Sequence, residues 1–382
     1  MSRADAQPHN GLVRITKIEW RGVKVPFGHP EDTGGRQLTR YGLLLWIQTE
    51  EGYMGVGEAS PPGLASEADI TQIGALLHDL APSALGLAPS VALDVIDMLT
   101  PHTPEGDVLR FGLETAVMDV VGQHAMRPIV TLLNGYIDWV PMTANISFLD
   151  ADETARQAAQ AVADGYACVK ISIGSRDADH DVEVVRQVRE AIGPDIALRA
   201  DGDEAWSPDR AIAALKQLEQ FNLEFIEQPV AATDLSGMAA VREAIAIPVA
   251  ADEAVKTIED AQAVIDARAA DVLIVKPSKA GGIRAAQRIM ELAAENGLRT
   301  VIASSMETGV GIAASLHLAS CLGDAEASAL ASSRMLESDM LKTPLVPVRG
   351  HITVPQLPGL GVEINHDSVD HYTAGVMGVI AG

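Results

Sequence analysis

From about residue 140 onward, short apolar segments alternate with longer segments whose apolar residues recur every three or four positions. The short segments have the length of buried strands, and the longer ones, such as DHDVEVVRQVREAIG, have the spacing of amphipathic helices. Repeated strand–helix units predict a parallel sheet, either a closed barrel or an open doubly wound sheet. No glycine-rich phosphate loop follows the first strand, which weakens the dinucleotide-binding alternative. The predicted strands are MTANISFL, ACVKISIG, IALRADGD, LEFIEQP, IPVAADE, DVLIVKP and RTVIASS.

The first third of the chain has a different pattern. Residues 12–60 alternate polar and apolar positions, as half-buried strands do, and include a hairpin with its turn at EEG. From about 66 to 135 the apolar spacing becomes helical. With 382 residues, the chain is long enough for two packed units. We therefore expect an α+β unit over residues 1–135, a β/α barrel over 136–345, and a C-terminal segment, 346–382, that returns to the first unit.

Composition narrows the classes of function. The formal net charge of −24 repels nucleic acid and anionic membrane surfaces, so we expect neither as a partner. We interpret the acidity mainly as a solvated surface. Cys168 and Cys321 each lie in an apolar stretch, which favours two buried thiols in a reducing, cytoplasmic compartment. The polar N-terminus lacks a signal-peptide core, and no run approaches the ~18 apolar residues of a membrane helix.

Polar side chains recur at the carboxyl ends of the predicted strands. In a barrel these ends meet at one mouth, where the active sites of this fold are built. Buried strands that end in ionisable residues are costly unless the charges are paired or functional. The residues at these ends, in chain order, are Lys170, Ser172, Asp201, Asp203, Glu227, Asp252, Glu253, Lys276, Ser304, Ser305 and Glu307.

Three of these residues, Asp201, Glu227 and Asp252, are carboxylates on consecutive strands. Each one alone has an ordinary interpretation as a helix N-cap or a turn residue. Gathered at one mouth they would repel one another, and a hard divalent cation would remove that cost. Oxygen-only ligands favour Mg²⁺ or Mn²⁺ over zinc. The sequence therefore predicts a metal site, flanked by Lys170 and Lys276.

Four motifs, IEQP, ADE, VKPSKAGGI and SSMETGVGIAASLHLA, carry a family resemblance, and the three acids are 26 and 25 positions apart. Together they resemble the muconate-lactonizing subgroup of the enolase superfamily along nearly the whole chain. The resemblance implies an α/β fold, a modified (β/α)₇β TIM-type barrel with an α+β capping domain over residues 1–135. It also implies Mg²⁺ (or Mn²⁺) on Asp201, Glu227 and Asp252. The implied substrate is a small carboxylate whose α-proton is removed while the enediolate is stabilised.

The same resemblance assigns roles to the flanking residues. Lys276 is implied to be an acid/base or cation stabiliser, and we expect Mg²⁺ and Lys170 to lower its pKa. Lys170 matches the first lysine of the subgroup's Lys-x-Lys motif, but Ser172 replaces the second, which is the base. Ser172 either takes part in catalysis or only hydrogen-bonds water or substrate. Asp203, where the subgroup usually has Asn, either tightens cation binding or pairs with Lys170.

The loop 26–40 is placed to close over the mouth and to determine specificity. Its charged side chains either meet a second carboxylate of the substrate or are merely solvated. We count Ser305 and Glu307 among the substrate-binding residues as well. The loop residues in question are Arg36, Arg40 and His29.

Ser172 also affects the choice of reaction. Racemisation moves a proton between two faces and normally needs two bases, so it is disfavoured, whereas a one-base syn elimination or cycloisomerisation remains open with Lys276 or Lys170 as the base. The segments TRYGLLLWIQTEEGYMGVGEASPPG and RFGLETAVMD resemble o-succinylbenzoate synthases, so a dehydratase of that type is the leading expectation. A muconate-type cycloisomerase and then an N-acylamino-acid or dipeptide epimerase follow, and a metal-binding scaffold without turnover is the alternative of another class. We expect a homo-oligomer, and we place His317 in the core.

Overall fold

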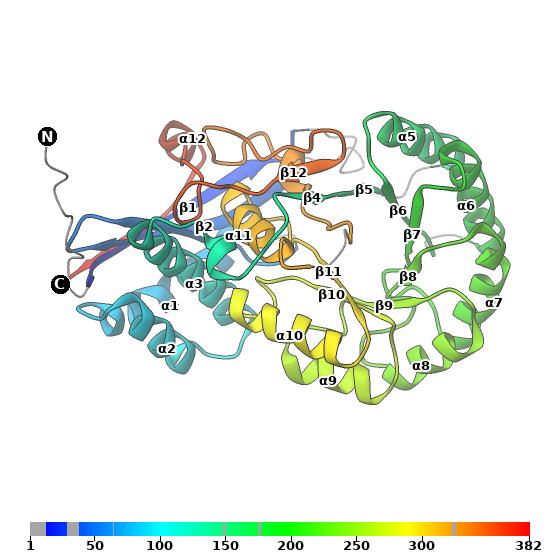
Figure 1. Cartoon of the computed structure of the whole chain (residues 1–382), viewed down its shortest axis with the longest axis horizontal. Helices are drawn as coiled ribbons and strands as arrows, with labels where there is room; N and C mark the ends of the chain where they lie inside the picture. The colour runs from blue at the N-terminus through cyan, green and yellow to red at the C-terminus, as the bar shows by residue number, and fades with distance from the viewer. Residues whose placement is uncertain (1–12, 29–37, 64, 148–149, 175–176, 323–325) are drawn as a thin grey trace, which may run out of the picture.

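The computed structural model describes residues 13–28, 38–63, 65–147, 150–174, 177–322 and 326–382. The predicted loop residues Arg36 and His29 lie outside the described residues. The chain forms two lobes (Figure 1). One lobe is an antiparallel sheet packed with helices, and the other is a ring of parallel strands surrounded by helices.

The first lobe is built on a four-stranded antiparallel sheet in the order β13-β1-β2-β3. Its strands β2 and β3 form the predicted hairpin, with Gly52 at φ 87° in the turn. The last strand of the chain pairs with the first, so the C-terminal segment returns to this sheet. The strands are β1 (Ile15–Pro26), β2 (Thr39–Thr49), β3 (Met54–Ala59) and β13 (Thr373–Ala381).

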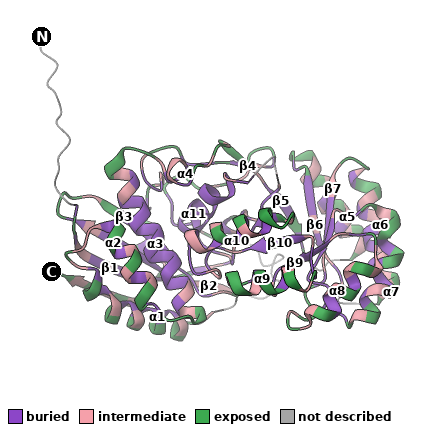
Figure 2. Ribbon diagram, turned by 60° about the horizontal axis from the view of Figure 1, so that its bottom comes forward, coloured by how far each residue is buried: buried purple, intermediate pink, exposed green. Residues whose placement is uncertain are grey.

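Helices α1 (Glu67–Leu80) and α3 (Pro104–Ala125) cover this sheet, and α2 (Pro89–Leu99) packs against α3. Helix α3 is buried around most of its circumference because the sheet lies on one side and the second lobe on the other (Figure 2). Glycines in β3 permit this packing, since a Cβ on Gly57 would lie only 1.9 Å from the carbonyl oxygen of Gly112 in α3.

The second lobe is a barrel of parallel strands with its helices outside (Figure 1). The spatial order of its seven paired strands is the chain order, β5 to β11. A doubly wound sheet reverses its order at a switch point, so this order excludes that alternative. All seven predicted strands are confirmed: β5 (Thr143–Ile146), β6 (Cys168–Ser172), β7 (Ala197–Asp201), β8 (Phe225–Glu227), β9 (Val249–Ala251), β10 (Val272–Val275) and β11 (Arg299–Ile302).

An eighth extended segment closes the ring. Ser328 forms a parallel bridge with Met142 beside β5, and Ala329 forms one with Ala303 beside β11. The fold is therefore the expected modified (β/α)₇β barrel. The helices that follow its strands are α5 (Ala151–Ala163), α6 (Ala178–Ile192), α7 (Pro208–Leu218), α8 (Leu235–Ala244), α9 (Ile258–Asp266), α10 (Ile283–Glu295) and α11 (Gly309–Ala319).

Helix α11 is buried on every side because it lies between the barrel and the capping sheet. Smaller elements complete the chain, and the tail contributes β12 as well as β13 to sheets formed with earlier residues. The smaller elements are β4 (Trp139–Pro141), β12 (His351–Thr353), α4 (Ile129–Leu132), α12 (His366–His371) and 3₁₀ helices at Ala81–Ala84, Glu219–Phe221 and Ser332–Met335. The boundaries at 135 and 345 stay predictions.

None of the described helices combines the length and apolar character that crossing a bilayer requires.

Candidate active site

The strand register brings three of the predicted site residues level with one another. Ser172 is paired with Asp201 across β6 and β7, and Asp201 is paired with Glu227 across β7 and β8. Asp252 follows the end of β9, and Lys276 follows the end of β10. These side chains therefore share one end of the barrel, as the sequence predicts.

Lys170 bridges two of the carboxylates. Its Nζ donates to Oδ2 of Asp201 at 2.9 Å and to Oε1 of Glu227 at 2.8 Å. Burial by itself lowers the pKa of Lys170, but the charges of Glu227 and Asp201 outweigh it and the pKa is raised. Lys170 is therefore a charged group that fixes two acids in place.

Lys276 forms an ion pair with Asp252. Burial lowers the pKa of Lys276, and the charge and hydrogen bond of Asp252 then raise it above its ordinary value. The expected lowering of this pKa was made for a site that holds Mg²⁺, and it stays a prediction. In the described structure the ammonium of Lys276 is paired with Asp252, whereas that of Lys170 is paired with Asp201 and Glu227.

Acidic groups outnumber cations around these pairs. Burial raises the pKa of Glu227; the charge of Lys170 opposes this, and the charges of Asp201 and Asp252 raise it further. Glu253, to which the sequence analysis assigned no role, has its pKa raised by burial and by Asp252. A further positive charge at the mouth would therefore offset the excess of acidic groups.

The three acids suit a hard divalent cation because of their ligand atoms and because they lie close together. They are all oxygen donors on consecutive strands, and the charges of Asp201 and Asp252 add to burial, the larger cause, in raising the pKa of Glu227. Among the described residues, however, no group of three or more His, Cys, Asp or Glu side chains converges on a point where a metal ion could sit. Lysine ammonium groups bond one oxygen of each carboxylate instead, Oδ2 of Asp201, Oε1 of Glu227 and Oδ2 of Asp252, so a cation would have to use the other oxygen of each or displace the ammonium.

The peptide after Glu227 is held in an uncommon conformation. Gln228 has φ 36°, and its buried side-chain oxygen accepts from the backbone N–H of Asp252 at 3.0 Å and of Ala254 at 3.2 Å. Positive φ in a residue other than Gly, Asn or Asp is strained. Gln228 therefore ties the end of β8 to the residue after β9 and fixes Glu227 beside Asp252. The motif IEQP contains this glutamine, and it was the feature of the sequence from which its role could have been inferred.

Asp203 does not pair with Lys170. Its side chain is exposed, and its backbone N–H donates to Oδ1 of Asp201 at 3.1 Å. Lys170 is already engaged by Asp201 and Glu227, which excludes the predicted pairing in this structure. Ser172 is half-buried at the end of β6.

Glu307 and Ser305 lie in the loop after β11, and both are buried. Glu307 accepts a hydrogen bond from Ser278 Oγ at 2.5 Å and another from the backbone N–H of Ser305 at 2.7 Å. Burial raises the pKa of Glu307. Ser278 is two residues beyond Lys276, so Glu307 connects the ends of β10 and β11.

Arg40 is on β2 and is only 2% exposed, so the interpretation as a solvated loop charge is wrong for this residue. Glu58, which the sequence analysis did not single out, lies beside it on β3 and binds the barrel. Its carboxylate accepts from the backbone N–H and the hydroxyl of Thr308 and from the N–H of Gly311, at 2.6–2.9 Å. A glutamate inside the buried strand MGVGEA was the available signal.

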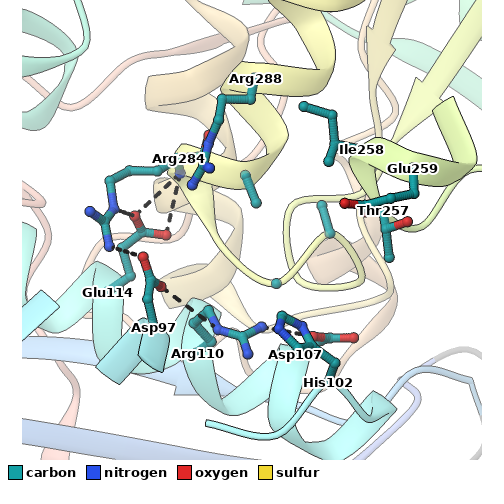
Figure 3. Close-up of a pocket in the computed structure, with 13 residues that line it drawn as sticks. Asp97, His102, Asp107, Arg110, Glu114, Thr257, Ile258, Glu259, Arg284 and Arg288 are labelled. Carbon is teal, nitrogen blue, oxygen red and sulfur yellow. Dashed lines mark hydrogen bonds and ion pairs between the residues drawn. The ribbon is translucent and has the colours of Figure 1, made fainter. Parts of the chain in front are cut away.

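A separate cavity of about 270 Å³ lies between the capping helices and the barrel, around α3 and the start of α10 (Figure 3). Its charges form a continuous chain, in which Arg110 bonds Asp107 at 2.8 Å, Asp97 lies 2.5 Å from Arg284, and Arg284 lies 2.6 Å from Glu114. All of these groups are paired, so this cavity is a polar seam between the lobes.

Comparisons with known proteins agree with this architecture. A family model described as "Enolase C-terminal domain-like" matches residues 153–368, more than half of the chain. The L-Ala-D/L-Glu epimerase of Bacillus subtilis (strain 168) is 29% identical over 358 residues, covering 92% of this chain and 97% of that protein. The o-succinylbenzoate synthase of Thermobifida fusca (strain YX) is 39% identical over 220 residues, covering 57% of this chain and 67% of that protein.

A solved structure extends the comparison to three dimensions. The 2-chloromuconate cycloisomerase from Rhodococcus opacus 1CP superimposes with a TM-score of 0.84 at 28% identity, covering 95% of this chain and all of that one. Proton abstraction beside a carboxylate is the chemistry that members of this superfamily share. The chain belongs to the enolase superfamily, within its muconate-lactonizing subgroup.

Proposed function

We propose that this protein removes the proton α to the carboxylate of a small substrate with one lysine, Lys276, and completes the reaction by expelling a leaving group, as in a dehydration of the o-succinylbenzoate synthase type. The observation that carries the proposal is the asymmetry of the mouth. Lys276 stands at the β10 side, whereas β6 ends in Ser172. A serine hydroxyl is too weakly basic to accept the α-proton, and a syn elimination needs a base on one face only.

Asp201, Glu227 and Asp252 would hold Mg²⁺ (or Mn²⁺) in this enzyme. When bound, the cation supplies Lewis-acid stabilisation of the negative charge that develops on the substrate carboxylate. Lys170 keeps Asp201 and Glu227 oriented through its two hydrogen bonds. Lys276 would act as the free amine, without its proton and its ion pair to Asp252, and would take up the α-proton to become the ammonium. The buried pair of Ser305 and Glu307 contacts the substrate.

Two further reactions remain candidates. A muconate-type cycloisomerisation also works with one base, and the similarity to a chloromuconate cycloisomerase over 95% of this chain supports it. An epimerisation of N-acylamino acids or dipeptides is suggested by the epimerase that matches along 97% of its length, but it transfers a proton between faces, and Ser172 counts against it.

Deuterium incorporation tests the proposal. In D₂O with Mg²⁺, NMR should show exchange or loss of the α-proton of a suitable carboxylate. Lys276→Met should slow this by about 10²–10⁴-fold, the usual contribution of a general base. Ser172→Ala should change it by less than about tenfold, because a hydroxyl contributes at most a hydrogen bond.

Lys216→Ala is the matched control, because Lys216 is exposed on α7, away from the strand ends. Exchange in the wild type that survives Lys276→Met would refute the assignment of the base. No exchange with any carboxylate would favour the scaffold without turnover. Racemisation by the wild type would overturn the one-base assignment, and a gain of racemisation in Ser172→Lys would support it.

A further inference from the structure

Arg40 has an unusual hydrogen-bonding state for a buried arginine. Its Nη1 donates to the carbonyl oxygens of Pro61 at 2.5 Å and Gly63 at 3.0 Å. Its Nε and Nη2 are buried and have no hydrogen-bond partner among the residues that the structure describes. Buried polar groups are nearly always paired, so two unpaired donors on one guanidinium indicate an acceptor that belongs there.

The capping sheet brings this guanidinium close to the mouth of the barrel. Arg40 is near enough to Glu307 and Glu58 for their charges to act on it, opposing the lowering of its pKa by burial. Glu307 in turn binds Ser278, two residues from Lys276. Arg40 is thus a buried cationic side chain of the capping sheet on which the charge of Glu307, in the loop after β11, acts.

The two neighbouring acids do not use the free donors of Arg40. Glu58 is satisfied by Thr308 and Gly311, together with the hydroxyl of Ser60 at 2.5 Å. Glu307 is satisfied by Ser278 and Ser305. The missing acceptor is therefore a group that neither lobe supplies among the described residues.

Charge decides what kind of acceptor fits. The charges of two carboxyl groups, Glu58 and Glu307, already act on this one guanidinium, so a substrate carboxylate would be the third acid around a single cation. A neutral carbonyl oxygen accepts two N–H bonds through its two lone pairs and adds no net charge.

We propose that Nε and Nη2 of Arg40 bind a neutral carbonyl oxygen of the substrate, a ketone or an amide, and not a second carboxylate. This rests on the proposed function in that the same substrate offers its carboxylate to the acids at the strand ends. It replaces the expectation that Arg40 meets a second carboxylate. The capping sheet then determines substrate specificity, because Arg40 binds substrates that have a carbonyl group near the reacting carboxylate more tightly than substrates without one.

Matched ligand pairs test this by isothermal titration calorimetry with Mg²⁺ present. The first pair is 4-(2-carboxyphenyl)-4-oxobutanoate and 4-(2-carboxyphenyl)butanoate, which differ by one C=O in place of CH₂. The second pair is N-acetyl-L-alanine and 2-methylpentanoate, in which the amide is replaced by two methylenes. The carbonyl member of at least one pair should bind the wild type about 10- to 100-fold more tightly, as bonds from a charged donor predict.

Arg40→Met should bring the two members of that pair to within about threefold of each other, and Arg40→Lys should keep only part of the preference, since an ammonium lacks the planar pair of donors. Arg110→Lys is the control, a buried capping arginine with its partners in place, and it should keep the ratio. Thermal unfolding checks that each variant is folded, and if Arg40→Met is not, Arg40→Lys decides.

A preference that survives in Arg40→Met, or a wild type that does not distinguish the members of either pair, or that binds none of the four compounds, overturns the proposal. Because binding is measured without turnover, a wild type that shows the carbonyl preference but no deuterium exchange would refute the proposed function and leave the Arg40 subsite standing.

Discussion

At the scale of single residues, the mouth of the barrel is organised by charge compensation. Two lysines hold three carboxylates, and Gln228 fixes the backbone between two of them. The acids remain in excess, because Glu253 adds a further carboxyl group beside Asp252. The folded chain therefore gains from any cation that the mouth can accept.

Added Mg²⁺ should raise the melting temperature of the wild type, because a ligand that binds only the folded state stabilises it by mass action. At about 100 times its dissociation constant, the ion contributes about 2.7 kcal/mol. Glu227→Gln should lose most of this shift, since it removes the central carboxylate. Glu295→Gln, the same change at an exposed glutamate at the last residue of α10, should keep it. Equal shifts in both variants, measured by scanning fluorimetry, would contradict the metal assignment.

His317 is a core residue, as expected. Its Nδ1 accepts from the backbone N–H of Val130 at 3.1 Å, which leaves Nε2–H to donate to the carbonyl oxygen of Leu360 at 3.0 Å. The neutral ring is therefore the form that fits. Burial lowers the pKa of His317 to about 4.

This lowered pKa makes stability depend on pH. Between pH 4 and 6.5 the unfolded chain binds the proton and the folded chain does not, so the contribution of His317 is complete above pH 6.5 and is lost as the pH falls toward 4. The loss amounts to about 3 kcal/mol for a shift of this size. Urea unfolding from pH 4.5 to 7.5 should show a shallower pH dependence for His317→Gln than for the wild type. If the free energy of unfolding had the same pH dependence in both proteins, burial of neutral His317 would not be a source of that dependence.

At the scale of elements, close backbone contacts in the capping lobe depend on positions without a side chain. A Cβ on Gly57 would meet Gly112 O at 1.9 Å, and one on Gly55 would meet Ala116 O at 2.0 Å. Strand β3 and helix α3 therefore touch through their backbones, and this contact sets the orientation of Glu58 on the same strand.

Gly57→Ala should lower the free energy of unfolding by about 3 kcal/mol or more, because the new methyl group forces β3 and α3 apart. Met54→Ala on the same strand is the control. Met54 is 46% exposed, so its loss should cost less than about 1 kcal/mol. Denaturant unfolding compares the two, and an equally small effect of both changes would show that α3 can shift freely.

The strands and the strand-end residues were predictable because each depends on a local pattern. Alternating strands and helices define the barrel, and Asp201, Glu227 and Asp252 end consecutive strands. The pairing of Lys276 with Asp252 depends on side-chain distances across β9 and β10, which periodicity does not reveal. Arg40 is buried where the charge of Glu307 acts on it, although the two residues are some 270 positions apart in the sequence, and no local pattern encodes that placement.

At the scale of the whole molecule, the two lobes are joined by polar contacts as well as by α11. Glu58 binds the start of α11, and Glu114 of the capping helix α3 binds Arg284 at the start of α10. Glu114 also accepts from the backbone N–H of Arg284 at 3.3 Å. The capping lobe thus holds two barrel helices by their N-terminal ends.

Glu114→Gln should lower the free energy of unfolding by about 2 kcal/mol, since it leaves Arg284 without its most buried partner. Asp94→Asn is the matched control. Asp94 faces the same arginine at 3.6 Å but is 80% exposed, so its change should have little effect on chemical denaturation. If the two substitutions proved equally mild, the seam would be a solvated contact with no part in joining the lobes.

The pairing of β1 with β13 has a consequence for how the protein is made. The ribosome releases β1 before the barrel and β13 after it, so the whole barrel is synthesised between these two strands. During that time β1 has one unpaired edge, and its register along that edge is undecided. The barrel strands, whose neighbours are also neighbours in the chain, can assemble in order as they emerge. The barrel, which carries the candidate active site, can therefore fold early during synthesis. The capping sheet can be completed only later, when β13 has been synthesised and pairs with β1.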